Sequence, residues 1–97
     1  MLIQHKQTAS RGIFFIPGEE EVLLAELVYM KKEPATMIIE HTEVDDELRG
    51  QNIGYQLVHH AIEYARVHQL KILPMCPFAR AVIERKPEYK DVVLEQL

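Results

Sequence analysis

Cysteine is scarce in this chain of 97 residues, and its one thiol, Cys76, cannot form a disulfide within the chain. We therefore expect a reducing, cytoplasmic setting. Long apolar runs are also absent: none approaches the ~20 residues of a membrane-spanning helix, and the first residues lack the apolar core of a secretion signal. We expect no membrane partner. Basic residues are fewer than acidic ones, with 11 lysines and arginines against 15 aspartates and glutamates. That balance argues against a nucleic-acid partner, which needs a basic surface.

The remaining composition is that of an ordinary globular protein. Hydrophobic residues make up 47% of the chain and charged residues 27%, which supports one folded domain over residues 1–97. No repeat, low-complexity segment or linker divides it. The histidines do not have metal-ligand spacing, since His59 and His60 are adjacent and point in different directions on a helix. We therefore expect no metal site.

Three strands are expected in the first half of the chain. Residues 12–16 form a short strand that ends at the turn Pro17-Gly18. Residues 22–30 suit either strand or helix by propensity, and the short connections favour a strand in an antiparallel meander. Residues 36–44 form the third strand. Regular alternation would place Ile38, Glu40, Thr42 and Val44 on one face, and Met37, Ile39, His41 and Glu43 on the other.

The clearest element is an amphipathic helix that begins near residue 53. Its apolar stripe consists of Ile53, Leu57, Val58, Ala61, Ile62 and Ala65. The chain is completed by a strand at residues 71–73, a second helix at 78–86 and an edge strand at 92–93. An exposed edge of this kind would favour pairing with another chain. The third strand, the long helix and the fourth strand form a βαβ unit. We predict an α/β fold with a mixed, mostly antiparallel sheet and two main helices.

A turn with two glycines joins the third strand to the long helix, with the sequence Leu48-Arg49-Gly50-Gln51-Asn52-Ile53-Gly54-Tyr55. Glycines at such a junction let backbone N–H groups point outward together, and the positive end of the helix dipole lies behind them. This arrangement makes a site for phosphate. The alternative is a tight turn in which glycine permits close contact between helix and sheet. The three-glycine dinucleotide fingerprint and the Gly-Lys-Ser/Thr phosphate loop are both absent.

The wider pattern around this turn resembles the acetyl-CoA motif of the GNAT acetyltransferase superfamily: Arg or Gln, two residues, Gly, one residue, then Gly or Ala. Arg49 and Gly54 fill the end positions. Asn52 stands at the middle glycine, and asparagine tolerates the left-handed backbone better than most residues. Three further blocks make the chain similar to the very small YjdJ-like members of the superfamily: His41-Thr42-Glu43-Val44, Leu73-Pro74-Met75-Cys76-Pro77-Phe78 and Pro87-Glu88-Tyr89.

The resemblance implies a reduced GNAT fold without the usual N-terminal helices, and binding of acetyl-CoA or CoA with its pyrophosphate on the backbone amides of the turn. The implied cofactor-binding residues are Val44, Arg49, Gly50, Gln51, Asn52, Ile53, Gly54, Tyr55, Cys76 and Phe78. In the superfamily a backbone N–H at the end of the preceding strand holds the acetyl oxygen, and Val44 or its neighbour matches that position.

Acetyl transfer to an amine also needs a base. His41 and Glu43 on the same strand are the candidates, and an unperturbed histidine titrates at ~6.5, close to working pH. A sheet histidine paired with a neighbour is the structural alternative for His41. The general acid of the superfamily is a tyrosine, but Arg85 stands at the matching position in this chain, and Tyr89 lies further along.

Cys76 precedes the second helix, where the helix dipole lowers the pKa of a thiol. The resemblance places the thioester beside it, so Cys76 could accept the acetyl group transiently in a ping-pong route. The alternative is a small buried hydrophobe beside the cofactor. We therefore interpret the chain as an N-acetyltransferase for an unidentified amine, on a small molecule or on a protein, with Cys76, His41 and Glu43 as catalytic candidates. A non-catalytic module of the same fold that binds CoA or a protein partner is the alternative.

Overall fold

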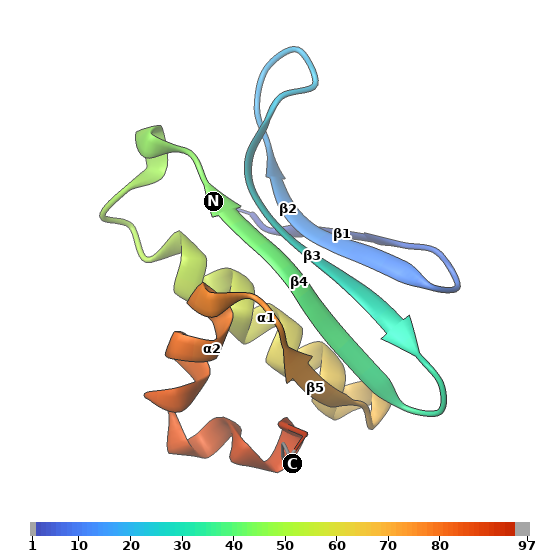
Figure 1. The fold of residues 1–97 in the computed structure, drawn as a ribbon. Helices are drawn as coiled ribbons and strands as arrows, with labels where there is room; N and C mark the ends of the chain where they lie inside the picture. The colour runs from blue at the N-terminus through green and yellow to red at the C-terminus, as the bar shows by residue number, and fades with distance from the viewer. Residues whose placement is uncertain (1, 95–97) are drawn as a thin grey trace.

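The computed structural model describes residues 2–94, which form a five-stranded sheet with two α-helices (Figure 1). The strands follow chain order across the sheet: β1 (Gln4–Gln7), β2 (Arg11–Pro17), β3 (Leu23–Lys32), β4 (Thr36–Val44) and β5 (Lys71–Pro74). The first four are antiparallel neighbours, and β4 pairs with β5 in parallel. The helix α1 (Ile53–His68) connects β4 to β5. The predicted α/β fold with a mixed sheet and a βαβ unit is therefore confirmed.

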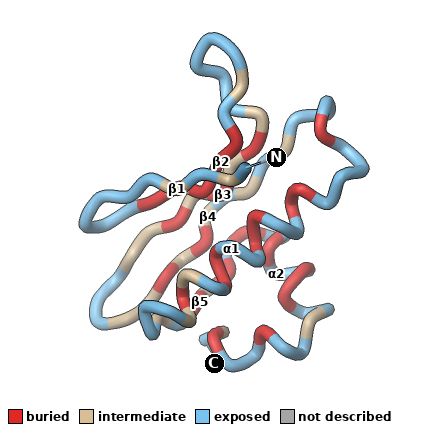
Figure 2. The backbone as a smooth tube through the Cα atoms, turned by 180° about the vertical axis from the view of Figure 1, so that it is seen from behind, coloured by how far each residue is buried: buried red, intermediate tan, exposed pale blue. Residues whose placement is uncertain are grey.

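The helix α1 runs along one face of the sheet, and its six predicted stripe residues are all buried. They pack with Phe14, Leu27, Tyr29, Met37 and Ile39 of the sheet in one hydrophobic cluster. Figure 2 shows that buried and exposed positions alternate along α1, as one inward face requires. A second helix, α2 (Pro77–Glu84), follows β5, and two 3-10 helices, η1 (Asp46–Leu48) and η2 (Pro87–Val92), precede α1 and follow α2. Within residues 2–94, no helix is both long and apolar enough to cross a bilayer.

The strand β1 was not predicted. Its residues Gln4 to Gln7 are all polar or charged and carry no apolar alternation. The strand pairs with β2 and is anchored by His5. The His5 imidazole stacks on Phe14 with ring centroids 4.1 Å apart, and its Nε2 lies 2.6 Å from the hydroxyl of Tyr29. A histidine therefore does the packing that an apolar side chain would otherwise do.

The predicted edge strand at residues 92–93 is wrong in extent. Val92 ends η2 and is buried, and Val93 alone forms a parallel bridge to Ile72 of β5. Pro87 explains the difference, because proline suits the first turn of a helix and starts η2 there. Pairing of this edge with another chain stays a prediction.

A β-bulge in β4 decides which of its side chains share a face. The register with β3 passes from Val28–His41 to Tyr29–Ile39, so Glu40 is an extra residue. Beyond it the alternation reverses. Val44 packs against the core and the Oγ1 of Thr42 is buried, on the side of Met37 and Ile39, whereas His41 and Glu43 turn to the open face. The predicted grouping of Thr42 and Val44 with Ile38 and Glu40 was therefore wrong, because a regular pleat was assumed.

Candidate functional site

The turn between η1 and α1 has the open backbone that an anion site requires. Gly50 has φ of 82°, and Asn52 has φ of 59° and ψ of 27°. Both lie in the left-handed region, so asparagine does keep the backbone shape expected of a glycine here. The first hydrogen bond of α1 runs from the Gln56 N–H to the Asn52 carbonyl at 3.0 Å. Within residues 2–94, no acceptor is found for the N–H groups of residues 50–55, which lie at the positive end of α1.

The side chains around this turn differ in their roles. Arg49 extends into solvent and pairs with Asp46 at 2.7 Å, and both side chains are largely exposed. Gly54 allows α2 to approach α1, because a Cβ at this position would lie 2.6 Å from the ring of Phe78. That ring also meets Tyr55 edge to face, with centroids 5.9 Å apart. The close contact at Gly54 therefore joins two helices, where contact with the sheet was the expected alternative.

A gap opens between β4 and β5 beyond Pro74. The strand β5 pairs only with residues 36–39 of β4, and the last bond across the pair runs from the Met75 N–H to the Ile39 carbonyl at 3.0 Å. The Asp45 N–H donates to the Leu24 carbonyl in β3. Because successive N–H groups of a strand point to opposite edges, the Val44 N–H points toward the gap. Val44 thus has the orientation that an oxygen-stabilising amide needs.

Cys76 lies directly before α2 and is 6% exposed. Burial raises the pKa of its thiol, but the N–H of Ala79, the hydroxyl of Thr42 and the N–H groups of Phe78 and Thr42 lower it, and the net shift is downward. Within residues 2–94, the buried Oγ1 of Thr42 has no hydrogen bond of standard geometry. The hydroxyl is thus not engaged by another group of the described residues, and it acts on the nearby thiol by lowering its pKa. Cys76 is therefore ionised to a greater extent than an ordinary buried cysteine, because its surroundings stabilise the thiolate.

His41 and Glu43 share a face, as predicted, but it is the open face of the sheet and not the buried face of Met37 and Ile39 with which they were grouped. The Nε2 of His41 is 2.8 Å from Glu26 Oε2 and 3.3 Å from Glu43 Oε1. Glu26 was missed by the sequence reasoning, because it reaches the site only through its register opposite Glu43. The three ligand atoms lie within 4.8 Å of one another, close enough to share a cation. This cluster and Cys76 are on opposite faces of β4, so the structure does not bring the three catalytic candidates together.

An acidic cavity of about 510 Å³ lies beside this cluster at the ends of β3 and β4. Its lining consists of Leu23, Leu24, Ala25, Glu26, Glu43, Val44, Asp45 and Asp46. The lining thus contains four carboxylates and no basic side chain. Such a cavity has a negative potential that attracts cations, including protonated amines.

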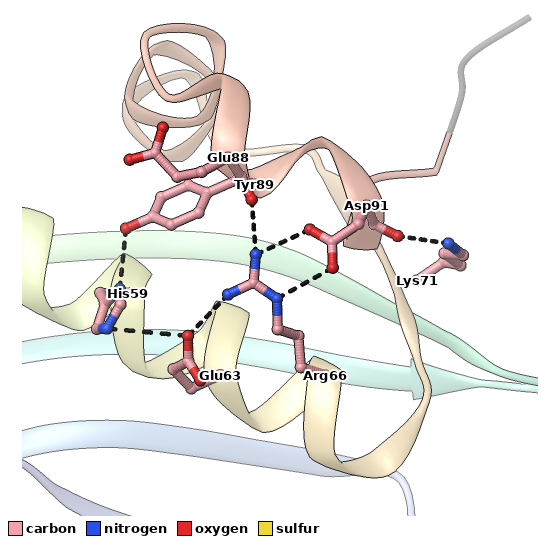
Figure 3. A network of polar contacts seen from close by, with 7 residues as sticks. All are labelled: His59, Glu63, Arg66, Lys71, Glu88, Tyr89 and Asp91. Atoms are coloured by element: carbon pink, nitrogen blue, oxygen red, sulfur yellow. Dashed lines mark hydrogen bonds and ion pairs between the residues drawn. The ribbon is translucent and has the colours of Figure 1, made fainter.

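Neither candidate for the general acid is placed at the thiol. The Arg85 guanidinium donates to the hydroxyl of Tyr55 at 3.3 Å, at the start of α1. The hydroxyl of the buried Tyr89 lies 3.0 Å from Nδ1 of His59 (Figure 3), and burial raises its pKa. The hydroxyl of Tyr89 is therefore held at His59 of α1 and does not face the thiol of Cys76.

An ion-pair network holds η2 against α1 (Figure 3). The guanidinium of Arg66 donates two hydrogen bonds to the carboxylate of Asp91, at 3.0 and 2.8 Å. It also donates to Glu63 at 2.8 Å and to the carbonyl of Glu88 at 2.6 Å. Planar bidentate pairing of this kind fixes geometry as well as charge. The network sets the position of the segment that carries Tyr89.

Comparison with known proteins identifies the family to which this fold belongs. The family described as GCN5-related N-acetyl-transferase matches residues 13–92. A GCN5-like protein of Staphylococcus aureus, solved by NMR, is 36% identical over 97% of this chain and 90% of its own, with a TM-score of 0.75. No curated protein matches significantly.

Two larger enzymes share the fold at lower identity. Nourseothricin acetyltransferase is 24% identical over 68% of this chain and 40% of its own, with a TM-score of 0.55. The IAA acetyltransferase of Bacillus cereus ATCC 14579 is 20% identical over 78% of this chain and 53% of its own, with a TM-score of 0.59. The family match covers residues 13–92, and the chain is 36% identical to the small GCN5-like protein. The chain therefore belongs to the GCN5-related N-acetyltransferase (GNAT) family.

Proposed function

We propose that this protein is an N-acetyltransferase that uses acetyl-CoA and acetylates an amine. The observation that carries the proposal is the contact of Phe78 with Gly54, which brings the starts of α1 and α2 together. One helix start presents free backbone N–H groups, and the other carries Cys76 with a lowered pKa. A phosphate site and a reactive thiol thus lie at two neighbouring helix starts, as a ligand with a pyrophosphate and a thioester would require.

The residues present fit such a ligand. Residues 50–55 offer backbone donors for the pyrophosphate, with the side chain of Arg49 alongside, and Cys76 and Phe78 lie toward the thioester end. Bound acetyl-CoA supplies an acetyl group activated as a thioester. The Val44 N–H, which points toward the gap between β4 and β5, is the donor for the oxygen that becomes negatively charged during transfer.

Cys76 is proposed to accept the acetyl group first. Its thiolate attacks the acetyl carbonyl carbon, a bond from carbon to Sγ forms, and the bond to the sulfur of CoA breaks as CoA leaves as a thiolate. The amine nitrogen then attacks the acetyl carbon on Cys76, the Cys76 thiolate departs, and the amine proton passes to a base. His41, held by Glu26 and Glu43, is the proposed base. It lies on the opposite face of β4 from Cys76, so the amine proton would have to reach it through water.

The acidic cavity favours a cationic acceptor. Its four carboxylates would attract a protonated amine before the amine loses its proton, and His41 lies next to Glu26 and Glu43 of that lining. We propose that this side receives the acceptor amine, on a small molecule or on a protein. The alternative is a module that binds CoA without turnover. The lack of a tyrosine at Cys76 and the separation of Cys76 from His41 favour that alternative.

Binding and turnover separate these cases. Calorimetry and amide chemical shifts should show acetyl-CoA and CoA binding at residues 49–55, and failure of both to bind would contradict both proposals. Release of free CoA should then be measured with small amines and with peptides that contain lysine. Binding without release would support the non-catalytic module.

Mass spectrometry tests the role of Cys76. After mixing with acetyl-CoA, the proposal expects one acetyl group on Cys76 of the native protein and none on the Cys76→Ser variant. No acetyl group on the native thiol, together with full activity of Cys76→Ser, would instead show direct transfer to the amine.

A further inference from the structure

The open face of the sheet, opposite the hydrophobic core, carries a patch of apolar side chains. Within residues 2–94, none of them belongs to the cluster in which the sheet packs against α1 and α2. The strand β1 contributes to the same face, because the ammonium of Lys6 lies 5.5 Å from the centroid of the Phe15 ring. An apolar patch with a charged border is typical of a surface that binds another macromolecule. The apolar residues of the patch are Ile13, Phe15, Val28, Met30 and Ile38.

Strand register arranges this face in rows that cross from β1 to β4. Paired residues of neighbouring strands point to the same face, so each row is a set of adjacent side chains. Apolar residues occupy the middle of the face, on β2 and β3, and polar or charged residues stand at its borders. The central row consists of Lys6, Ile13, Val28 and His41, and the rows beside it consist of Gln4, Phe15, Glu26 and Glu43, and of Arg11, Met30 and Ile38.

The two borders of this face differ in charge and in shape. Lys6 and Arg11 line a hollow of about 590 Å³ on the side of β1 and β2. Arg11 is paired with Glu40 at 3.0 Å, whereas Lys6 forms no ion pair in the described part of the chain. On the side of β4, the side chains of His41 and Glu43 are 47% and 71% exposed, so they project from the sheet. One border is therefore a hollow with basic groups, and the other is a projection with acidic groups.

A two-fold axis would bring these borders together in two copies of the chain. An axis along the strands, between β2 and β3, places β1 of one copy opposite β4 of the other. Lys6 then faces His41 and Glu43 of the second copy, and Ile13 faces Val28. Each contact occurs twice, because a two-fold interface is self-complementary. Stacked sheets pack about 10 Å apart, a distance that a lysine side chain can cross to reach a carboxylate.

We propose that a second copy of this chain docks on the open face, so that two sheets stack in a symmetric dimer with the apolar patch between them. Four strands about 4.8 Å apart, with three same-face residues about 6.7 Å apart on each, span roughly 20 Å in each direction. This patch of about 400 Å² per copy is about half of what a standard stable interface buries on each side. The dimer is therefore weak and reversible, with a dissociation constant of about 100 μM.

This inference stands apart from the proposed function, because it uses neither the turn at residues 49–55 nor Cys76. The two are connected at one residue. Pairing would cover His41, the proposed base, and would leave the turn free. If both proposals hold, association lowers turnover and leaves acetyl-CoA binding unchanged.

Sedimentation of the protein without ligand, at concentrations that bracket about 100 μM, tests the proposal. The average mass of the native protein should rise from that of a monomer toward that of a dimer. Lys6→Glu and Glu43→Lys should each weaken association about tenfold or more, because each variant places two like charges opposite each other at both contacts. A 1:1 mixture of the two variants should associate again, because both contacts then join opposite charges.

Matched controls lie away from the open face. Lys90→Glu, on η2, and Glu84→Lys, on α2, change the same charges at exposed side chains. Each should associate like the native protein, and mixing the two should give no further gain. The rescue in the mixture of Lys6→Glu and Glu43→Lys also excludes a loss of folding as the cause of the single effects.

The contrary outcomes are specific. A native protein that stays monomeric at about ten times the expected dissociation constant would overturn the proposal. A dimer that survives in both variants, or a mixture that associates no better than either variant alone, would also overturn it. Amide shifts on dilution should fall on the open face of β1 to β4, and shifts confined to β5 and η2 would place the interface at the other edge instead. Because none of these measurements uses acetyl-CoA, failure of the dimer leaves the proposed function intact.

Discussion

The acidity of the Cys76 thiol depends in part on Thr42, and a single substitution tests this dependence. Thr42→Val keeps the β-branched shape and the backbone N–H but removes the hydroxyl. Burial of Cys76 would remain, while one of the groups that oppose its effect would be lost. We therefore expect the pKa of the thiol to rise in this variant.

The magnitude follows from the contacts that remain. A hydrogen bond to a charged partner contributes about 1.5–3 kcal/mol, and about 1.4 kcal/mol corresponds to a tenfold change in an ionisation equilibrium. The N–H groups of Phe78 and Ala79 still act on the thiol in the variant, so the lower end of that range applies. The thiolate fraction at neutral pH should fall about tenfold.

The assay is the rate of alkylation by iodoacetamide as a function of pH. Because only the thiolate reacts, Thr42→Val should react about tenfold more slowly near pH 7 and at nearly the native rate near pH 10. Thr42→Ser, which restores a hydroxyl, should recover most of the native profile. Superimposable profiles of native protein and Thr42→Val would refute the reasoning. A rate reduced equally at every pH would also refute it, since that pattern indicates altered access.

Three further predictions concern the scaffold. Gly12→Ala should cost about 1–3 kcal/mol of unfolding free energy, since its Cβ would lie 2.2 Å from ring atoms of the fully buried Tyr29. Urea unfolding measures this, and native-like stability would contradict it. The free energy of unfolding should fall as pH drops below about 6.5, because burial, then Lys31 and His68, lower the pKa of His5. The unfolded chain therefore takes up the proton first, and urea midpoints should depend less on pH in His5→Phe; an unchanged slope would exclude this role. Arg66→Met should speed amide exchange of Tyr89, whose N–H bonds to the Lys86 carbonyl, while β2 and β3 keep their protection. Unchanged exchange at Tyr89 would show that the network does not hold η2.

Local chemistry made some of the fold predictable. The stripe of α1 is visible because burial against a sheet requires apolar residues at helical spacing, and all six predicted positions are buried. Asn52 was expected to take the left-handed backbone, and it does. The position of Cys76 before α2 followed from Pro77, which starts a helix readily. Each of these depends on residues close together in the chain.

The rest of the site depends on contacts between distant residues. The strand β1 has no apolar pattern, since the ring of His5 supplies its anchor. Glu26 meets His41 through the register of β3 and β4, and Tyr89 meets His59 through the packing of η2 on α1. The extra residue Glu40 leaves no signal in composition or periodicity, so the exchange of Thr42 and His41 between faces could not be read from the sequence.

The bulge at Glu40 separates two chemistries that adjacent residues carry. Loss or gain of one residue before His41 would exchange them: the imidazole would face the thiol, giving a Cys–His pair, and the hydroxyl would face solvent. The present register keeps the imidazole on the open face of the sheet and the thiol on the face covered by helices. An imidazole and a thiol thus lie on opposite sides of one strand, with a single bulged residue maintaining the division.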